Sequence, residues 1–351
     1  MNPQAARPAY WRYFASVAAS GDDSPLYALL ADRIADAPAL QALAGLAQPG
    51  QPPANMLLGA VHFLLLGGAR HPLRNWYPHL AGAAATPVSD AAWDAFCDFT
   101  TRYRDEIAPI VAARVTNTNE VRRCTHLRAG YAEITARTGR PLGLIELGPS
   151  AGLNLNVDHY AVRYRFADRD VLCGPSSALE LEAAAEGPIP APTEPPQIDW
   201  RLGLELNPVD LSSAADRRWL VALLWPGQSE RIARLETALQ IAQAHPPPIR
   251  AGDALAALPG ALDEIPGTCT RVVAHSLVTY QWTQAMRDAL VEILRAASLS
   301  RPVLRLHHDV VDAAADPSAM PLVLETWRDG MVVAERLADA HHHGASLAWR
   351  T

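Results

Sequence analysis

The sequence predicts an α/β protein with a helical N-terminal section, a mainly parallel sheet and an antiparallel C-terminal hairpin. Residues 142–155 read as a strand, a turn with two glycines and a helix. Apolar runs at 200–205 and 271–276 are each followed by helical periodicity, which is typical of β-α units. Residues 322–349 alternate in polarity around Asp329-Gly330, a hairpin turn signal.

The composition is that of a large folded protein. The 351 residues are 49% hydrophobic and 19% charged, which suffices for one enlarged domain or two. A net charge of -7 gives no overall cationic field, so we expect no nucleic-acid partner. The 4 cysteines lack C-x-x-C spacing, and no apolar run is long enough to span a bilayer. We therefore expect a cytoplasmic protein with no membrane partner and no disulfide framework, whereas the sequence leaves its oligomeric state open.

The first 115 residues carry helical spacing and no strand pattern. Leucines and an isoleucine recur at helix spacing between residues 26 and 34, and again between 57 and 65. We expect residues 1–115 to form a helical lid or cap, and residues 116–351 to form one α/β domain. Trp76 and Tyr77 lie in a proline-bounded loop of this section. Such aromatic residues are commonly core residues, but under a lid they would line a substrate site.

A further helix is expected between the helical N-terminal section and the strand at 142–147. Its apolar face runs from Val121 to Ile134, and it stops at Gly139-Arg140-Pro141. This face leaves Glu120 and Arg122 away from the core, so we expect them to face a ligand, with polar capping of the helix as the alternative. Because this helix feeds directly into the strand at 142–147, its start belongs near the glycine turn.

The region of about 159–198 reads as a β insertion. Residues 159–166 alternate in polarity, residues 171–173 are placed to pair with them, and residues 178–182 alternate again. A proline-rich stretch at 187–196 follows. We expect a small β excursion and a linker before the α/β pattern resumes.

Three carboxylates stand at the ends of three expected strands. Glu146, Glu205 and Asp253 each close or follow an apolar run. Charges are rarely buried without partners, so packing alone does not explain the repetition. The turn reads Glu-x-Gly-x-x-x-Gly, which is neither the dinucleotide nor the P-loop pattern. A carboxylate before the first glycine suits a ligand that presents hydroxyl or cationic groups rather than phosphate.

These strand ends resemble the class I S-adenosylmethionine-dependent methyltransferases, which have a Rossmann-like sheet with an antiparallel C-terminal hairpin. Ser150 stands where their first motif commonly has its middle glycine. The resemblance implies that Glu205 accepts both ribose hydroxyls and that Asp253 accepts from the adenine amino group. The combination of hPLRNWYP, TNTNEVRR, ELGPSAGLNLN, GLELNPVD and a terminal HG-x-x-x-x-W also resembles an uncharacterised bacterial family of methyltransferase-like proteins, which supplies no established reaction.

The expected site follows from this resemblance. The candidate binding residues for S-adenosylmethionine are Asn119, Glu146, Gly148, Ser150, Gly152, Asn154, Glu205, Asn207, Asp253, Ala254, His275 and Ser276. The candidate catalytic residues are Glu120, His275 and Tyr280. The candidate substrate-binding residues are Trp76, Tyr77, Arg122 and Trp282. For Ser150 and Asn154, helix capping is the alternative interpretation.

Two other kinds of site are not favoured. His307-His308-Asp309 and His341-His342-His343 suggest a metal, but adjacent histidines in a strand point to opposite faces, so we expect no metal. His275-Ser276 could act as a base and a nucleophile, but no G-x-S-x-G turn surrounds Ser276. We expect both residues to line the site.

We expect a transferase that uses S-adenosylmethionine to act on a small molecule, most simply by methyl transfer. Two alternatives stay open. One is a cyclase or lyase in which the amine of the same molecule closes a ring and releases methylthioadenosine. The other is a non-catalytic binding protein that keeps the fold. A lid and an acidic chain fit an enclosed pocket better than a polymer groove, which favours a small substrate.

Overall fold

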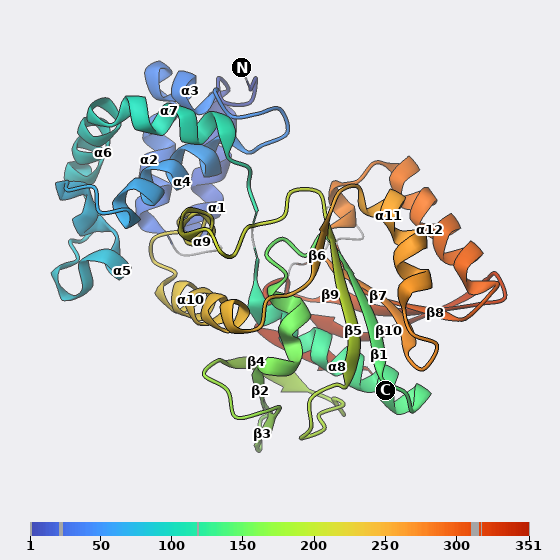
Figure 1. Ribbon diagram of the computed structural model, residues 1–351. Helices are drawn as coiled ribbons and strands as arrows, with labels where there is room; N and C mark the ends of the chain where they lie inside the picture. Colours follow the sequence, from blue (N-terminus) through green and yellow to red (C-terminus); the bar gives the residue numbers. More distant parts are fainter. Residues whose placement is uncertain (1, 21–23, 118, 310–315, 317, 351) are drawn as a thin grey trace. The chain divides into compact units, whose positions relative to one another are not determined.

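The computed structural model describes residues 2–20, 24–117, 119–309, 316 and 318–350 (Figure 1). The chain forms two compact units. The first comprises residues 1–118 and 210–236, and the second comprises residues 119–209 and 237–351. The expected mixed α/β class, with a mostly parallel sheet, antiparallel C-terminal strands and helices, is confirmed.

The first unit is helical throughout its described residues. Its elements are α1 (Pro8–Ser20), α2 (Pro25–Ile34), α3 (Pro38–Ala44), α4 (Pro53–Leu66), η1 (Pro72–Trp76), α5 (Pro78–Ala81), η2 (Gly82–Ala84), α6 (Asp90–Arg102), α7 (Arg104–Ala113) and α9 (Ala214–Ala222). Helix α4 is apolar on nearly all sides and is buried at its centre. A proline in the first turn helps to start α2, α3 and α4, where a missing N–H costs no helical hydrogen bond.

The segment 210–236 differs from the sequence expectation, which placed it in the α/β domain. Trp219 of α9 and Leu223 pack with the N-terminal helices instead. A Cβ on Gly59 of α4 would lie 3.3 Å from the Trp219 ring, so the glycine permits this close approach. The large apolar surface of α4 is thus covered by a helix that lies about 150 residues further along the chain. The helix α10 (Ser229–Ala244) begins in this segment and continues into the second unit.

The second unit is built on one sheet. Its strands are β1 (Leu142–Leu147), β2 (Ala161–Arg165), β3 (Asp170–Cys173), β4 (Glu180–Glu186), β5 (Ile198–Glu205), β6 (Ile249–Ala251), β7 (Thr270–Ser276), β8 (Val303–His308), β9 (Met320–Arg328), β10 (Met331–Ala340) and β11 (Ser346–Trp349). Its helices are η3 (Val121–Arg123), α8 (Cys124–Thr138), η4 (Leu153–His159), α11 (Ala254–Glu264), η5 (Thr279–Gln281) and α12 (Gln284–Ser298).

The strand order is β3-β2-β4-β11-β10-β9-β8-β7-β1-β5-β6. From β6 to β8 all neighbours pair in parallel, and the chain order reverses at β1. In open α/β sheets, ligands bind beyond the carboxyl ends of the strands at such a switch point. Strands β9 and β10 are antiparallel and form the expected hairpin at Asp329-Gly330.

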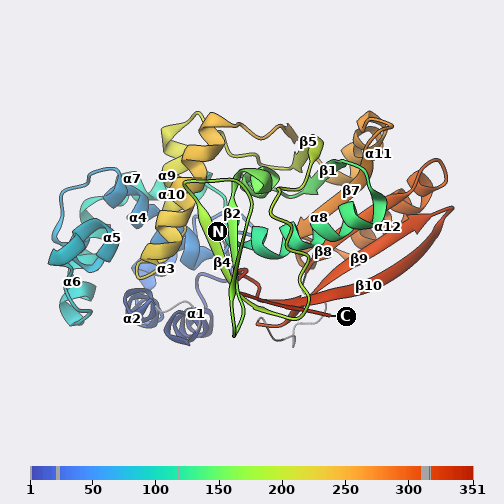
Figure 2. The same cartoon turned by 90° about the horizontal axis from the view of Figure 1, so that it is seen from below.

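The insertion at about 159–198 is not the separate small β excursion that the sequence predicted. Strands β2 and β3 pair antiparallel as expected, but β4 pairs in parallel with both β2 and β11. The insertion therefore extends the main sheet through the last strand of the chain. In Figure 2, β4 and its neighbour β2 meet the red C-terminal strands at their lower ends.

Alternation along the strands assigns side chains to the two faces of the sheet. Ile145, Leu147 and Val273 share a core with α11 and α12. The opposite face carries α8, where Gly130 leaves no room for a Cβ because it would lie 2.5 Å from Leu306. Glu146, one residue from Ile145, therefore belongs to the α8 face. Among the described residues, no helix is both long and apolar enough to cross a membrane.

Candidate functional site

The turn after β1 is a left-handed backbone corner. Gly148 has a φ of 62°, Ser150 58° and Gly152 74°. A Cβ on Gly152 would lie 2.7 Å from Pro247 Cγ, so glycine is required there by both backbone and packing. Three N–H groups of this corner are already engaged: Gly148 donates to Leu204 O, Ser150 to Glu205 Oε2 and Gly152 to Pro149 O. These amides are thus not offered to a phosphate.

Glu146 closes β1 and is buried, with 4% of its surface exposed. Its Oε1 accepts a hydrogen bond from Asn154 Nδ2 at 3.2 Å, and the Oδ1 of that amide accepts from Cys124 Sγ. Burial raises the pKa of Glu146 to about 7, against the opposing effects of Asn154 and Arg123. A carboxyl group at a strand end whose pKa lies near neutral pH is typical of a functional position.

Glu205 and Asp253 lie at or just after the ends of β5 and β6, the two strands that follow β1 in the sheet. The sequence predicted Glu205 at the end of its strand. Glu205 is the last residue of β5, and its two oxygens accept from Ser150 N at 2.8 Å and Asn207 N at 3.0 Å. Asp253 caps α11 by accepting from Leu255 N at 2.8 Å. Each carboxylate has lone pairs beyond these bonds, since an ionised carboxylate offers about four acceptor sites.

The strand pleat separates His275 from Ser276. His275 alternates with Val273 and faces α11 and α12, whereas Ser276 shares its face with Glu146 and α8. The parallel pairing with β8 continues this division: His275 lies opposite His307, and Ser276 lies opposite His308. This confirms the expectation that adjacent histidines diverge.

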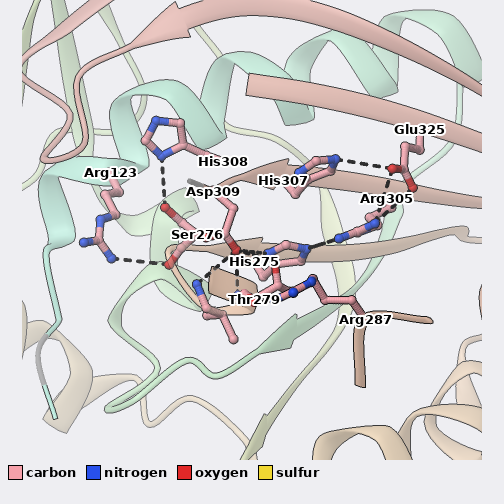
Figure 3. Close-up of polar contacts among 11 residues, drawn as sticks. Arg123, His275, Ser276, Thr279, Arg287, Arg305, His307, His308, Asp309 and Glu325 are labelled. Atoms are coloured by element: carbon pink, nitrogen blue, oxygen red, sulfur yellow. Dashed lines mark hydrogen bonds and ion pairs between the residues drawn. The ribbon is translucent and has the colours of Figure 1, made fainter. Parts of the chain in front are cut away.

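His275 is the centre of a polar network on the α12 face (Figure 3). Its Nε2 accepts from Nε and Nη2 of Arg305 at 3.1 and 2.9 Å, and its Nδ1 lies 3.3 Å from Asp309 Oδ2. Arg305 also pairs with Glu325, and Asp309 accepts from Thr279 N at 2.6 Å. Burial lowers the pKa of His275 to about 4. With its lone pair directed at Arg305, His275 is not arranged as the base that the sequence suggested.

Ser276 bonds to a second buried histidine. Its Oγ lies 3.2 Å from His308 Nδ1, and His308 Nε2 lies 3.3 Å from Ala340 O. Figure 3 shows the Ser276 side chain pointing toward His308, with Arg123 approaching the Ser276 carbonyl. The ring of His126 on α8 lies 4.2 Å from that of His308. The three side chains form the α8 side of the strand end.

The segment that leads into α8 contributes Asn119 and Glu120. Both are buried, although the sequence placed Glu120 away from the core. Asn119 Nδ2 donates to Pro149 O at 2.7 Å, which holds the segment against the glycine corner, and Glu120 Oε1 accepts from Arg122 N. Arg122 Nε donates to Glu182 O on β4. The physical reason for the burial is that this segment packs against the glycine corner and bonds to β4 rather than lying on the surface.

Two buried oxygen atoms at this corner have no hydrogen-bond partner among the described residues. They are Oδ1 of Asn119 and Oγ of Ser150. The two residues are 8% and 5% exposed, respectively. Buried polar atoms nearly always have partners, so each such atom calls for an explanation. Both belong to the same corner as Glu146 and Gly148.

The remaining predicted residues lie in several settings. Trp76 and Tyr77 are buried in the core of the helical unit, and their place in a substrate site stays a prediction. Tyr280 is 52% exposed in η5, and Trp282 packs beside the α11 and α12 core. Asn207 is exposed beyond β5, and Ala254 begins α11.

Cys124 and His308 were not predicted as residues of this site, because they reach it through long-range pairing; the sequence indicated His308 only as a possible metal ligand. Ser150 was predicted as a binding residue. Residues 148–152 also read G-x-S-x-G, the turn of a nucleophilic serine, which is a second signal at this position. No imidazole hydrogen-bonds to Ser150 Oγ among the described residues. The described residues also contain no cluster of three or more potential metal ligands.

Comparisons with known proteins place the chain in a family. No curated protein and no solved structure matches it. A family model described as "Uncharacterized protein conserved in bacteria (DUF2332)" matches residues 10–349, and the chain belongs to that family.

Proposed function

We propose that the second unit binds S-adenosylmethionine beyond the carboxyl ends of β1, β5 and β7 and transfers its methyl group to a small molecule. The observation that carries this proposal is the polarity of the corner. Acceptors with remaining lone pairs gather there, while three of its backbone donors are already engaged. Such a corner suits a ligand rich in donors and positive charge and disfavours phosphate.

The residues present fit the parts of this ligand. Glu205 has acceptor capacity for a vicinal diol, and Asp253 keeps its capping bond while a second oxygen is available for an amino group. Glu146, Asn119 and Ser150 supply acceptors at the switch point of the sheet. Approach of a cation or of further donors would favour ionised Glu146, whose pKa burial raises to about 7.

The chemistry needs positioning more than acid-base catalysis. The cofactor supplies a methyl carbon on a positively charged sulfur, which is an excellent leaving group. In methyl transfer, a lone pair of the substrate would form the new bond to that carbon, the carbon–sulfur bond would break, and its electron pair would remain on sulfur as a neutral thioether. An amine or hydroxyl substrate then releases its proton to a base or to water. Buried walls at the strand ends would orient the substrate and exclude competing water.

Glu120 and Tyr280 remain the candidate bases, since His275 directs its lone pair at Arg305. Glu120 is buried beside the glycine corner segment, whereas Tyr280 is half exposed. Burial raises the pKa of Tyr280, so its phenol would act as a donor rather than as a base near neutral pH. We therefore favour Glu120.

The two other uses of this fold predict different products. A cyclase or lyase would release methylthioadenosine without a second substrate, and a non-catalytic protein would bind without turnover. Ser150 favours a further candidate, an acyl-transfer enzyme, through its G-x-S-x-G turn and its φ of 58°. Against it stands the unpartnered Ser150 Oγ, because a nucleophilic serine needs an adjacent base.

Mass spectrometry of the reaction products tests these assignments. The full chain is incubated with S-adenosylmethionine alone and with a small-molecule extract of bacteria. Formation of S-adenosylhomocysteine only in the presence of the extract would support methyl transfer. Formation of methylthioadenosine without the extract would contradict methyl transfer and support the cyclase or lyase. Covalent labelling of Ser150 by a fluorophosphonate would instead favour acyl transfer.

A further inference from the structure

The hydrogen atoms of the Ser276–His308 pair can be assigned from their partners. A backbone carbonyl only accepts, so the His308 Nε2 that lies 3.3 Å from Ala340 O carries the ring hydrogen. Burial lowers the pKa of His308 to about 3, so the ring is neutral and its other nitrogen carries a lone pair. That nitrogen, Nδ1, lies 3.2 Å from Ser276 Oγ. The serine hydroxyl must therefore donate its hydrogen to His308.

This bond fixes what Ser276 can offer to any other molecule. A hydroxyl has one hydrogen and two lone pairs, and here the hydrogen is committed. Arg123 Nη1 donates to the backbone carbonyl of Ser276, at 3.4 Å, rather than to its hydroxyl. Ser276 Oγ is thus available only as an acceptor, and its bond to the buried His308 ring holds it in place.

The position of Ser276 gives this acceptor a use. It is the last residue of β7, on the face of the sheet that also carries Glu146. The residue that follows, Leu277, has a φ of 56°, and its N–H donates to His308 O, so the chain turns sharply away immediately after Ser276. Strands β1 and β7 border the switch point, where a ligand is expected.

We infer that Ser276 is a specificity-determining residue that selects a substrate whose reacting atom carries a hydrogen, an amine or a hydroxyl group. This inference rests on the proposed function. The N–H or O–H donates to Ser276 Oγ, which leaves a lone pair of the reacting atom for the methyl carbon. A carboxylate, phosphate or thioether has no such hydrogen and would meet a lone pair instead, with loss of binding.

Two analogues of the cofactor probe the position of the transferred methyl group, which lies next to the reacting atom of the substrate, without knowledge of that substrate. Sinefungin carries an amine on a carbon in place of the methyl-bearing sulfur, and S-adenosylhomocysteine lacks that amine. Calorimetry on the full chain gives the ratio of their dissociation constants. The variants Ser276→Ala and Ser276→Cys remove or weaken the acceptor, and Ser276→Thr keeps it. Ser298→Ala is the matched control, because Ser298 is similarly buried but lies on α12 and donates to Arg295 O.

We expect the wild type and the variants Ser276→Thr and Ser298→Ala to prefer sinefungin. Ser276→Ala and Ser276→Cys should reduce that preference by about tenfold, the usual effect of one hydrogen bond to a charged group. An unchanged ratio in both variants would overturn the role of Ser276 while leaving the cofactor site intact. If the wild type binds neither analogue, nor S-adenosylmethionine, the proposed function fails and this inference fails with it.

Discussion

The burial of Glu146 predicts that Glu146→Gln stabilises the second unit at alkaline pH. The carboxyl group is 4% exposed, and burial raises its pKa from 4.5 to about 7. A folded-state pKa above the unfolded value means that the folded chain binds the proton more tightly. The contribution of Glu146 to stability is therefore greatest at low pH, falls as the pH rises from 4.5 to 7, and is constant above that window.

The magnitude follows from the size of the shift. A shift from 4.5 to about 7 corresponds to roughly 3 kcal/mol of unfolding free energy lost on ionisation. Glutamine has nearly the same shape and stays neutral, so it avoids this loss while it retains an acceptor for Asn154 Nδ2. We expect the two proteins to differ little at pH 4.5 and Glu146→Gln to be more stable by about 3 kcal/mol at pH 8.

Urea unfolding at several pH values, followed by hydrogen exchange of the β1 amides, measures this difference in the sheet itself. Following one strand separates the second unit from the helical unit, since a chain of two units need not unfold in one step. The control is Glu186→Gln on β4, whose carboxyl is exposed and pays little for burial. A gain that does not change with pH, or a loss at pH 8, would refute the burial argument.

Three further substitutions follow from the same contacts. Arg305→Met should lower the unfolding free energy by about 3 kcal/mol in urea titrations, because it leaves the mostly buried carboxylate of Glu325 without its guanidinium partner. Arg295→Met, in an exposed ion pair, should cost much less, and equal costs would contradict this. Gly152→Ala should lower the melting temperature more than Gly139→Ala, because both glycines have a positive φ but only a Cβ at Gly152 would contact another side chain. The reverse order would show that the corner can rearrange to make room for the added methyl group. Asp253→Ala should cost about 1 kcal/mol of stability through its lost cap, and Asp253→Asn should restore it; a cost shared by both variants would exclude capping as its origin.

Local patterns were sufficient to predict most strands and helices. Strand β1 spans Leu142–Leu147, as its apolar run predicted, and Glu205 is the last residue of β5. These elements are set by the spacing of apolar residues and by turn signals such as Asp329-Gly330, all of which lie within a few residues. The three carboxylates likewise follow from the ends of apolar runs.

Long-range pairing was not predictable in this way. The contact of β4 with β11 joins residues about 160 positions apart, and neither strand carries a signal for its partner. Helix α9 joined the N-terminal helices because α4 is apolar on nearly all sides, which the sequence shows, although it does not show which segment covers it. The sequence predicts that His307 and His308 point to opposite faces, but only the pairing with β7 shows that His307 lies opposite His275 and His308 opposite Ser276.

The central claim is that the strand-end corner accepts a donor-rich, cationic adenosyl ligand and not a nucleoside phosphate. Calorimetry of the full chain with S-adenosylmethionine and with ATP tests it most directly, because both carry adenosine but differ in charge. We predict saturable binding of S-adenosylmethionine, weakened in Glu205→Ala, and no binding of ATP. Tighter binding of ATP, or no binding of S-adenosylmethionine by the folded protein, would contradict the claim.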